Sequence, residues 1–345
     1  MTSHISSASA VDIVAVDGLN RLAHLVQRPE QTLYRLRALD ADPRFRSEYL
    51  VDRRCLLALP LYFPQVAAWP DAAYAAGARL GYGSDRADAW ALAGGRADLR
   101  AGFVRLSPGD ERTLNRAALS LTHAAARRAE REDRRLAALY VDERDQLLRA
   151  AMYRAGLTRA ITLGSRAILA HVGRTADEYL RGLKARRRSI VRRDLRDLKR
   201  ANVRAEVVAW DEVISFAAPS VADIHNRHGE VDHPLLVQDR LEQWSENPDV
   251  VTIAFAVRAG RKLVGASFAW VNDTALEMYE LALPGVRSHT RRLLYLELLF
   301  YGPLRFCWEH ELSQLDLALE ASEPKALRGA ALERVLGLTH PAVES

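Results

Sequence analysis

The feature that most constrains the fold is a run of three strand-like segments in the second half of the chain. Apolar and β-branched residues fill residues 250–257, 263–271 and 275–283, and the connections RAGRK and NDT between them carry turn-forming residues. A helical pattern over residues 288–310, a strand over 313–319 and a helical segment from about Lys325 follow. A meander followed by helix, strand and helix is an α+β order, unlike the strict alternation of a doubly wound sheet.

Helix-strand units also occur earlier, and 345 residues are enough for about two domains. We expect a disordered tail over residues 1–12, an N-terminal domain over 13–165 and a C-terminal domain over 166–345. The second domain is expected to begin with a strand at 166–173 and a long helix at 175–201. The other segments that we expect are strands at 55–62, 135–141 and 204–210, helices at 111–131, 143–155, 211–228 and 234–245, and a loop-rich stretch at 67–96.

Cysteine usage and hydropathy exclude several classes of protein. Cys55 and Cys307 belong to no CxxC pair, so neither a disulfide framework nor a zinc site is indicated. The start of the chain lacks the apolar stretch of a secretory signal. The longest apolar run, residues 55–63, is interrupted by Pro60 and is far shorter than the roughly 20 residues of a membrane span. We expect a soluble, cytoplasmic protein without a membrane span. The sequence gives no indication of its oligomeric state.

The most charged segment is residues 181–200, which hold ten basic side chains against only Asp194 and Asp197. Ten minus two leaves a surplus of eight positive charges, more than the +5 net charge of the whole chain. An apolar stripe at helical spacing predicts that this helix docks on a core and turns its cationic faces outward. The stripe comprises Leu180, Leu183, Ile190, Val191, Leu195 and Leu198, and Arg187 interrupts it.

Three interpretations of this basic helix stay open: a solvated arginine face, a membrane-surface helix and a surface for a polyanion. A helix flanked by strands cannot easily expose its apolar stripe, which disfavours the membrane. Because guanidinium groups suit phosphate, the candidate polyanions are tRNA and a nucleotide-linked ligand such as CoA. The candidate phosphate-binding residues are Arg186, Arg187, Arg188, Arg192 and Arg193.

Three carboxylates fall on strands that we expect to be covered on both faces. Strand alternation predicts Leu276, Met278, Glu280 and Ala282 on one face, and Glu277, Tyr279, Leu281 and Leu283 on the other. Asp316 is the third carboxylate, within the strand at 313–319. Because burying an unpaired carboxylate is costly, each is neutral, paired or functional. We take Glu280 and Asp316 as candidate catalytic residues, and Glu277 and Tyr279 as candidate substrate-binding residues.

His225 and His228 share a helix face and stand among several other polar residues. The pattern HxxH is loose, Gly229 is expected to end the helix, and no fourth ligand is evident, so we expect no metal. Two interpretations stay open: the wall of a polar, substrate-binding pocket, and ordinary polar side chains at a helix end. The neighbouring polar residues are Asp223, Glu230, Asp232 and His233.

Several stretches resemble the FemAB-type branch of the GNAT acyltransferase superfamily, and its peptidoglycan-biosynthesis group in particular. They are YLRGLKARRRSIVRRDLRDLKRANV at 179–203, the later LLYLELLFYGPLRFCWEHEL, and LDLALEASEPKALRGAAL followed by His340. In the first half only LLALPLY at 56–62 is similar. The resemblance implies two GNAT-like domains side by side, the first of them degenerate. It also implies acyl transfer from an aminoacyl-tRNA, or from acyl-CoA, to an acceptor amine, hydroxylamine or hydroxyl.

The resemblance also assigns roles to residues near the end of the chain. By position, Lys325 is the lysine that lies beside the acyl-transfer centre in such enzymes, and Arg328 and Gly329 complete the K..RG pattern. Within the turn at 284–292, the segment RSHTR at 287–291 lacks both glycines with which ordinary GNAT proteins hold the CoA pyrophosphate. Arg287 and Arg291 are candidate phosphate contacts in their place, so CoA is weakened as a donor without being excluded.

Taken together, the sequence predicts an acyltransferase with aminoacyl-tRNA as co-substrate and no other cofactor. The acceptor is expected to be a small molecule or a cell-wall precursor. Acyl-CoA is the alternative donor, and a non-catalytic RNA-binding protein is the alternative from a different class.

Overall fold

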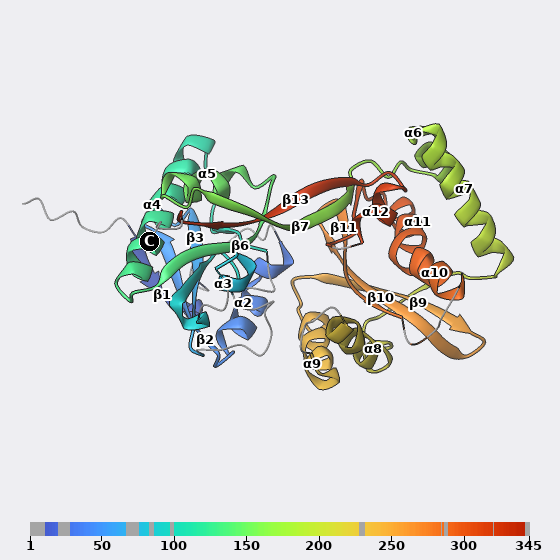
Figure 1. Cartoon of the computed structure of the whole chain (residues 1–345), viewed down its shortest axis with the longest axis horizontal. Coiled ribbons are helices and arrows are strands. Elements are labelled where there is room, and N and C mark those ends of the chain that lie inside the picture. Colours follow the sequence, from blue (N-terminus) through green and yellow to red (C-terminus); the bar gives the residue numbers. More distant parts are fainter. Residues whose placement is uncertain are drawn as a thin grey trace, which may run out of the picture. The chain divides into compact units, whose positions relative to one another are not determined.

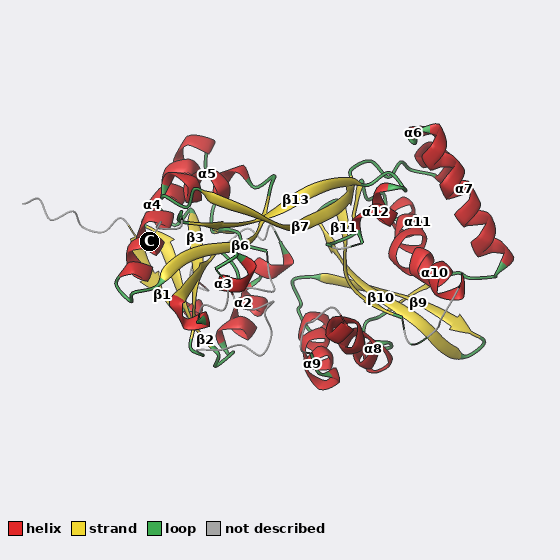
Figure 2. Ribbon diagram, viewed as in Figure 1, coloured by secondary structure: helices red, strands yellow, loops and turns green. Residues whose placement is uncertain are grey.

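The computed structural model describes most of the chain, and its helices and strands are shown in Figures 1 and 2. The described residues are 11–19, 28–66, 76–82, 86–96, 100–227, 232–283, 285, 289–319 and 321–341. They form two compact units. Unit 1 comprises Met1–Leu163 and Arg334–Ser345, and unit 2 comprises Gly164–Glu333. Of the tail expected at residues 1–12, residues 1–10 lie outside the described part, and Val11 begins a strand.

Unit 1 contains a mixed sheet in the order β1-β2-β3-β4-β6-β13. Neighbouring strands are antiparallel, except that β4 and β6 are parallel. The strands are β1 (Val11–Val14), β2 (Phe45–Asp52), β3 (Leu57–Pro64), β4 (Trp90–Ala93), β6 (Arg135–Asp142) and β13 (Ala331–Thr339), with β5 (Val104–Arg105) beside β3. The residues of β13 from Arg334 onward belong to unit 1 because they pair with β6, whereas the sequence had assigned them to the second domain.

The helices of unit 1 cover its sheet. Asp110 caps the longest helix, α4, by accepting a hydrogen bond from the backbone N–H of Thr113 (2.9 Å). The predicted stripe of α4, including Leu114 and Leu121, is buried against β3 and β6. The helices are α1 (Val16–Leu19), η1 (Pro29–Gln31), α2 (Leu33–Asp40), α3 (Ala76–Arg79), η3 (Ala87–Ala89), α4 (Glu111–Glu130) and α5 (Gln146–Arg154).

Unit 2 repeats the strand pattern of unit 1. Its order is β7-β12-β11-β10-β9-β8, and again one internal pair, β11 with β12, is parallel while the others are antiparallel. The strands are β7 (Arg159–Leu169), β8 (Glu206–Val208), β9 (Val251–Ala259), β10 (Lys262–Asn272), β11 (Ala275–Ala282) and β12 (Gln314–Asp316). The predicted meander is therefore confirmed as β9, β10 and β11, and the α+β class with it.

The helices of unit 2 lie on both faces of this sheet, with α8 and α9 on one face and α10 and α11 on the other (Figure 1). The single helix predicted at 175–201 is wrong: the chain is extended at Leu183 and Lys184, so two helices replace it. The helical segment expected from Lys325 is short and gives way to β13. The helices are α6 (Ala176–Gly182), α7 (Ala185–Arg200), α8 (Ile214–Arg227), α9 (Pro234–Ser245), α10 (His289–Leu296), the π-helix η4 (Glu297–Tyr301), α11 (Gly302–Glu309) and α12 (Ser322–Ala326).

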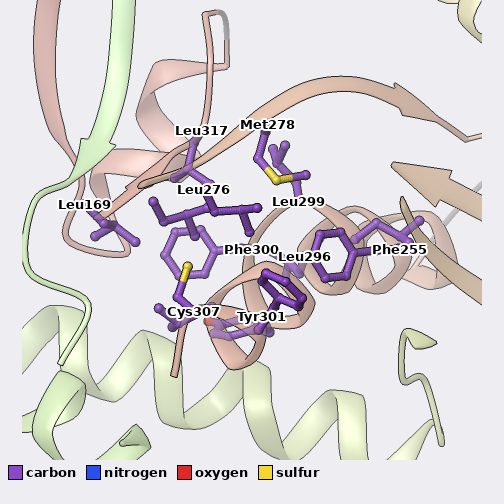
Figure 3. Close-up of a cluster of buried hydrophobic side chains, with 14 of the residues drawn as sticks. Leu169, Phe255, Leu276, Met278, Leu296, Leu299, Phe300, Tyr301, Cys307 and Leu317 are labelled. Atoms are coloured by element: carbon purple, nitrogen blue, oxygen red, sulfur yellow. The ribbon is translucent and has the colours of Figure 1, made fainter. Parts of the chain in front are cut away.

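The apolar core of unit 2 lies between the sheet and the segments α7, α10, η4 and α11. Figure 3 shows Leu276 and Met278 of β11 directed at Leu299 and Phe300 of η4. The buried carboxylate of Glu297 pairs with Arg305 and accepts the backbone N–H of Ala205 at 2.8 Å. This core fixes β11 and β12, which carry the candidate site.

We predict that Leu338→Ala destabilises unit 1 by about 2–5 kcal/mol, because Leu338 of β13 is buried in the core of that unit. Leu332→Ala is the matched control, since Leu332 lies on the same strand with 46% of its surface exposed. That control should change stability by no more than about 0.5 kcal/mol. Urea denaturation measures both effects, and hydrogen exchange should quicken in β6. Equal losses in the two variants would contradict this placement of β13.

Candidate functional site

The candidate site lies where β11 and β12 of unit 2 separate. These parallel strands pair only between residues 275–277 and 314–316. Beyond that register β11 continues to Ala282, whereas β12 ends at Asp316. In sheets with parallel strands, ligands bind beyond the carboxyl ends of strands where neighbours diverge. The residues around this point include the candidate catalytic residues Glu280, Asp316 and Lys325.

The equivalent point in unit 1 is filled by the chain itself. There β4 and β6 pair only as far as residues 92 and 137. Beyond it the N–H of Ala101 donates to the Tyr140 carbonyl (3.3 Å), and the N–H of Gly102 donates to the Gly94 carbonyl (3.0 Å). Gly94 has a φ of +83°, and a Cβ there would lie 2.9 Å from the Gly102 nitrogen. Backbone therefore bridges the two strands of unit 1 at the point where they separate.

A β-bulge in β11 changes the faces on which its side chains lie. Against β10, Ser267 pairs with Leu281 but Ala269 pairs with Met278, so β11 holds one extra residue. As a result Leu281 packs with Met278 in the apolar core, while Glu280 contacts side chains of α8 and α9. The prediction that Glu280 shares a face with Met278 is wrong, because strict alternation does not survive an inserted residue.

Glu280 belongs to a network of four charged side chains. The His225 Nδ1 atom lies 2.8 Å from the Asp232 carboxylate, and its Nε2 atom lies 3.4 Å from that of Glu280. Arg240 of α9 pairs with Asp232 (3.0 Å) and approaches Glu280 (3.6 Å). Two cationic and two anionic groups thus balance one another beside the bulge. His228 lies outside the described residues.

The carboxylates around His225 decide its protonation state. Burial disfavours the charged imidazole, but hydrogen bonds to Asp232 and Glu280 outweigh it and raise the pKa of His225 to about 10. At neutral pH the ring is therefore an imidazolium, which donates hydrogen bonds and cannot accept a proton. Among the described residues, no three His, Cys, Asp or Glu side chains lie together in a way that could hold a metal ion.

Tyr279 lies in an aromatic wall that the sequence did not reveal. Its ring centre is 4.8 Å from that of Trp270 and 6.1 Å from that of Trp210, to which it is nearly parallel. Trp244 packs edge-on against it at 5.9 Å. These tryptophans are about 30 residues apart in sequence and come from different elements, so no periodic signal could have grouped them. The wall positions the bulge from the side of α8 and α9.

Glu277 and Asp316 are cross-strand neighbours and share one arginine. Arg166 of β7 forms an ion pair with Asp316 and lies 3.7 Å from Glu277. Glu277 also accepts hydrogen bonds from the Trp270 indole (3.1 Å) and the Asn272 amide (3.0 Å). Both carboxylates are thus buried with a cationic partner. Arg166 is one of 45 arginines in the chain, and nothing in its sequence context distinguishes it.

Lys325 belongs to α12, and its side chain reaches back to the residues that follow β12. Only 4% of its surface is exposed. Its Nζ atom donates to the backbone carbonyls of Leu319 (2.6 Å) and Ala318 (3.4 Å). Ala318 has a left-handed φ of +60°, and its N–H donates to Asp316 (2.9 Å). The ammonium group therefore holds the turn that leads from β12 into α12. A role for Lys325 in catalysis stays a prediction.

Arg328, the second residue of the K..RG pattern, is bound to a fully buried carboxylate. Asp194 of α7 has no exposed surface and lies 2.6 Å from Arg328 and 2.9 Å from Arg292. The hydroxyl of Tyr301 donates to the same carboxylate at 2.9 Å. Gly329 follows with a φ of +99°, and a Cβ there would lie 2.5 Å from the Leu183 side chain. The pattern therefore joins the end of α12 to the basic helix.

The ten basic side chains of residues 181–200 form no ion pair with any carboxylate of the described residues. The two acidic residues of the helix pair with later arginines instead, Asp194 with Arg328 in the interior and Asp197 with Arg292 (3.0 Å) near the surface. Among the predicted phosphate contacts, Arg186, Arg192 and Arg193 are exposed, Arg187, Arg188 and Arg291 are half-buried, and Arg287 lies outside the described residues. The result is a strongly cationic surface whose side chains lack ion-pair partners among the residues that the structure describes.

Comparison with known proteins shows the class of fold. No family model and no curated protein sequence matches the chain. Solved structures do match: FemX has a TM-score of 0.58 at 11% identity, over 96% of this chain and 97% of that chain. A C-terminal domain assigned to a lysylphosphatidylglycerol synthetase from Agrobacterium fabrum has a TM-score of 0.56 at 13% identity, over 95% and 92%.

A tandem GNAT protein from the clavulanic acid biosynthesis pathway matches over 97% of this chain and 99% of that chain, with a TM-score of 0.52 and 16% identity. These likenesses show that the chain has a tandem GNAT-like fold. The resemblance to the FemAB-type branch is thus confirmed at the level of fold. Within the described residues no helix combines the length and hydropathy that crossing a bilayer requires.

We predict that Asp194→Asn lowers the free energy of unfolding by about 3–5 kcal/mol, because it leaves the buried Arg328 guanidinium without its counter-charge. Asp197→Asn is the matched control, since Asp197 pairs with Arg292 near the surface and should contribute no more than about 1 kcal/mol. Urea denaturation of both variants measures the difference. A similar small loss in each would show that the buried pair stabilises nothing.

The raised pKa of His225 predicts a pH dependence of stability. A group whose pKa is raised on folding stabilises fully below its ordinary value near 6.5, and that stabilisation is lost as pH rises through about 10. The unfolding free energy should therefore fall between these values, and fall less in His225→Asn. The exposed His171→Asn serves as control. An NMR titration in which the His225 ring deprotonates near pH 6.5 would contradict the network.

Proposed function

We propose that the protein is an acyltransferase that transfers an aminoacyl group from an aminoacyl-tRNA to an amine, hydroxylamine or hydroxyl of its acceptor. One observation carries the choice of donor: ten basic side chains at residues 181–200 have no ion-pair partner in the described part of the chain, while both carboxylates of the same helix pair with later arginines. Such a surface fits a polyanion. The tandem GNAT-like fold, shared with FemX, supports acyl transfer.

In this proposal the ester of the donor is already activated, so positioning supplies most of the rate. The acceptor nucleophile attacks the ester carbonyl, and Lys325 stabilises the oxyanion with its compact ammonium group. The intermediate then collapses, the acyl–oxygen bond to the tRNA ribose breaks, and the ribose oxygen leaves as a hydroxyl by taking up the proton that the nucleophile gave to the base. Glu280 is the better candidate to receive the proton, because it lies on the bulge beyond the separation of the strands. Asp316 is only 1% exposed and bound to Arg166, so we assign it to the support of the turn.

Acyl-CoA remains the second candidate donor, and the fold shared with a tandem GNAT protein favours it. Against it stands the segment RSHTR at 287–291, which lacks both glycines that let backbone N–H groups approach a pyrophosphate. A non-catalytic RNA-binding protein is the third candidate. The acceptor that we propose is a small molecule or a cell-wall precursor.

The donor is tested by following labelled amino acid from a charged tRNA mixture into a panel of amine and hydroxyl acceptors. Digesting the tRNA with RNase beforehand should abolish transfer, and acyl-CoA in its place should not support it. Transfer that resists RNase and requires acyl-CoA would establish the second candidate. Tight tRNA binding without transfer to any acceptor would indicate a non-catalytic protein.

We predict that Lys325→Arg lowers transfer by about 100-fold, because a broad guanidinium cannot replace a compact ammonium beside a small oxyanion. The variant Lys262→Arg, at the turn between β9 and β10, is the control for a lysine outside the site. Because Lys325 also holds the turn after β12, the thermal unfolding of each variant is measured beside its activity. Near-normal turnover in both Lys325→Arg and Lys325→Ala would show that this lysine has a structural role only and none in catalysis.

A further inference from the structure

A pocket of about 310 Å³ lies between α6 and α7 in unit 2. Its lining comes from both helices and includes none of the residues at the separation of β11 and β12. The pocket depends on the break at Leu183 and Lys184, because one continuous helix would have no second helix to enclose it. Figure 1 shows α6 and α7 as separate helices joined at this break. The lining residues are Asp177, Leu180, Arg181, Arg188 and Arg192.

The pocket is strongly cationic. Three guanidinium groups face one carboxylate, and none of the four forms an ion pair within the described part of the chain. Arg188 donates to the Leu183 carbonyl (2.9 Å), and Arg181 lies 3.4 Å from the Asp177 carbonyl. The Nε atom of Arg188 is buried and has no hydrogen-bond partner among the described residues. A buried N–H group without an acceptor is costly, and a shift of the Arg188 side chain towards a bound anion would relieve that cost.

Phosphate is the anion that these groups fit. Guanidinium groups bind phosphate oxygens with paired hydrogen bonds, and several of them can surround one phosphate. The cavity is roughly ten times the volume that a water molecule occupies in the liquid, about 30 Å³. It therefore has room for a phosphate group together with ordered water.

The source of that phosphate is decided by the apolar side chains of the two helices. A helix that binds a bilayer inserts its apolar face into the lipid. Here Leu183, Val191 and Leu198 are buried in the core of unit 2, and none of the large exposed apolar side chains of the described residues lies on α6 or α7. The exposed surface of α7 beyond the pocket is basic, with Arg193, Arg196, Lys199 and Arg200. This surface suits a nucleic acid backbone and not a membrane.

We propose that the pocket between α6 and α7 binds one backbone phosphate of the tRNA, and that Arg181, Arg188 and Arg192 hold it together. The exposed basic residues of α7 then follow the backbone away from that phosphate. This inference rests on the proposed use of aminoacyl-tRNA. It adds a single anchoring point, away from the site of acyl transfer, where the RNA is fixed in register.

The test measures the affinity for deacylated tRNA by fluorescence anisotropy between about 50 and 200 mM salt. Arg181→Ala and Arg192→Ala should each weaken binding by about tenfold and lower the salt slope by about one. The double variant should lower the slope no further, because both arginines contact the same phosphate. Arg196→Ala, Arg200→Ala and their double variant are the controls outside the pocket, and any slope changes there should add.

A second arm replaces chloride by inorganic phosphate at constant ionic strength. Phosphate should displace tRNA from the wild-type protein and have no excess effect on the Arg181→Ala/Arg192→Ala variant. Unchanged or additive slopes in the pocket variants would overturn the inference. So would the loss of binding to phosphatidylglycerol vesicles with tRNA binding intact, because it would assign the pocket to lipid.

The failure of this inference is distinguishable from failure of the proposed function. Unchanged tRNA binding in the pocket variants, with RNase-sensitive transfer in the wild type, would overturn the pocket alone. Wild-type protein that binds tRNA through the pocket but transfers nothing would overturn the proposed function alone. A wild-type protein without affinity for tRNA would overturn both.

Discussion

The second half of the molecule depends on one buried carboxylate, that of Asp194. A charge without access to water is tolerated only when strong partners surround it, and Asp194 has two guanidiniums and a hydroxyl. These partners come from α10, η4 and the turn after α12, so the carboxylate joins α7 to three later segments of the chain. Because the Asp194 carboxylate pairs with arginines outside α7, it does not neutralise the basic side chains of that helix, which can therefore bind an external anion.

Residue patterns within a segment correctly predicted those helices and strands whose type depends on the residues of that segment alone. The meander β9–β11 and helices such as α4 followed from periodicity and turn chemistry, as did the α+β class. The break at Leu183 and Lys184 could not be predicted in this way, because helical spacing of apolar residues continues across it. The break accompanies a tertiary contact, the packing of Leu183 over Gly329, which no local pattern records. The C-terminal strand β13 was missed for a similar reason, since its partner β6 lies about 200 residues earlier.

The candidate site was predictable in its residue types and less so in its geometry. The resemblance to FemAB-type proteins singled out Lys325, and the expected burial of charge on strands singled out Glu277, Glu280 and Asp316. Their partners could not be chosen from the sequence, because Arg166 and Arg240 resemble many other arginines. The bulge in β11 was equally invisible, and it alone decides that Glu280 meets His225 and not the apolar core. Sequence periodicity does not tell which arginine pairs with which carboxylate, or which residues of neighbouring strands lie opposite one another.

The position of β13 has a consequence for the synthesis of the chain on the ribosome. Unit 1 consists of residues up to Leu163 and again from Arg334, so 334 − 163 = 171 residue steps separate its two parts. At 5–20 residues per second this interval lasts roughly 10 to 30 seconds, during which β6 has an open edge on the side that β13 later occupies. Open strand edges attract other strands. The nascent first unit therefore exposes an edge to which other strands can pair until β13 emerges.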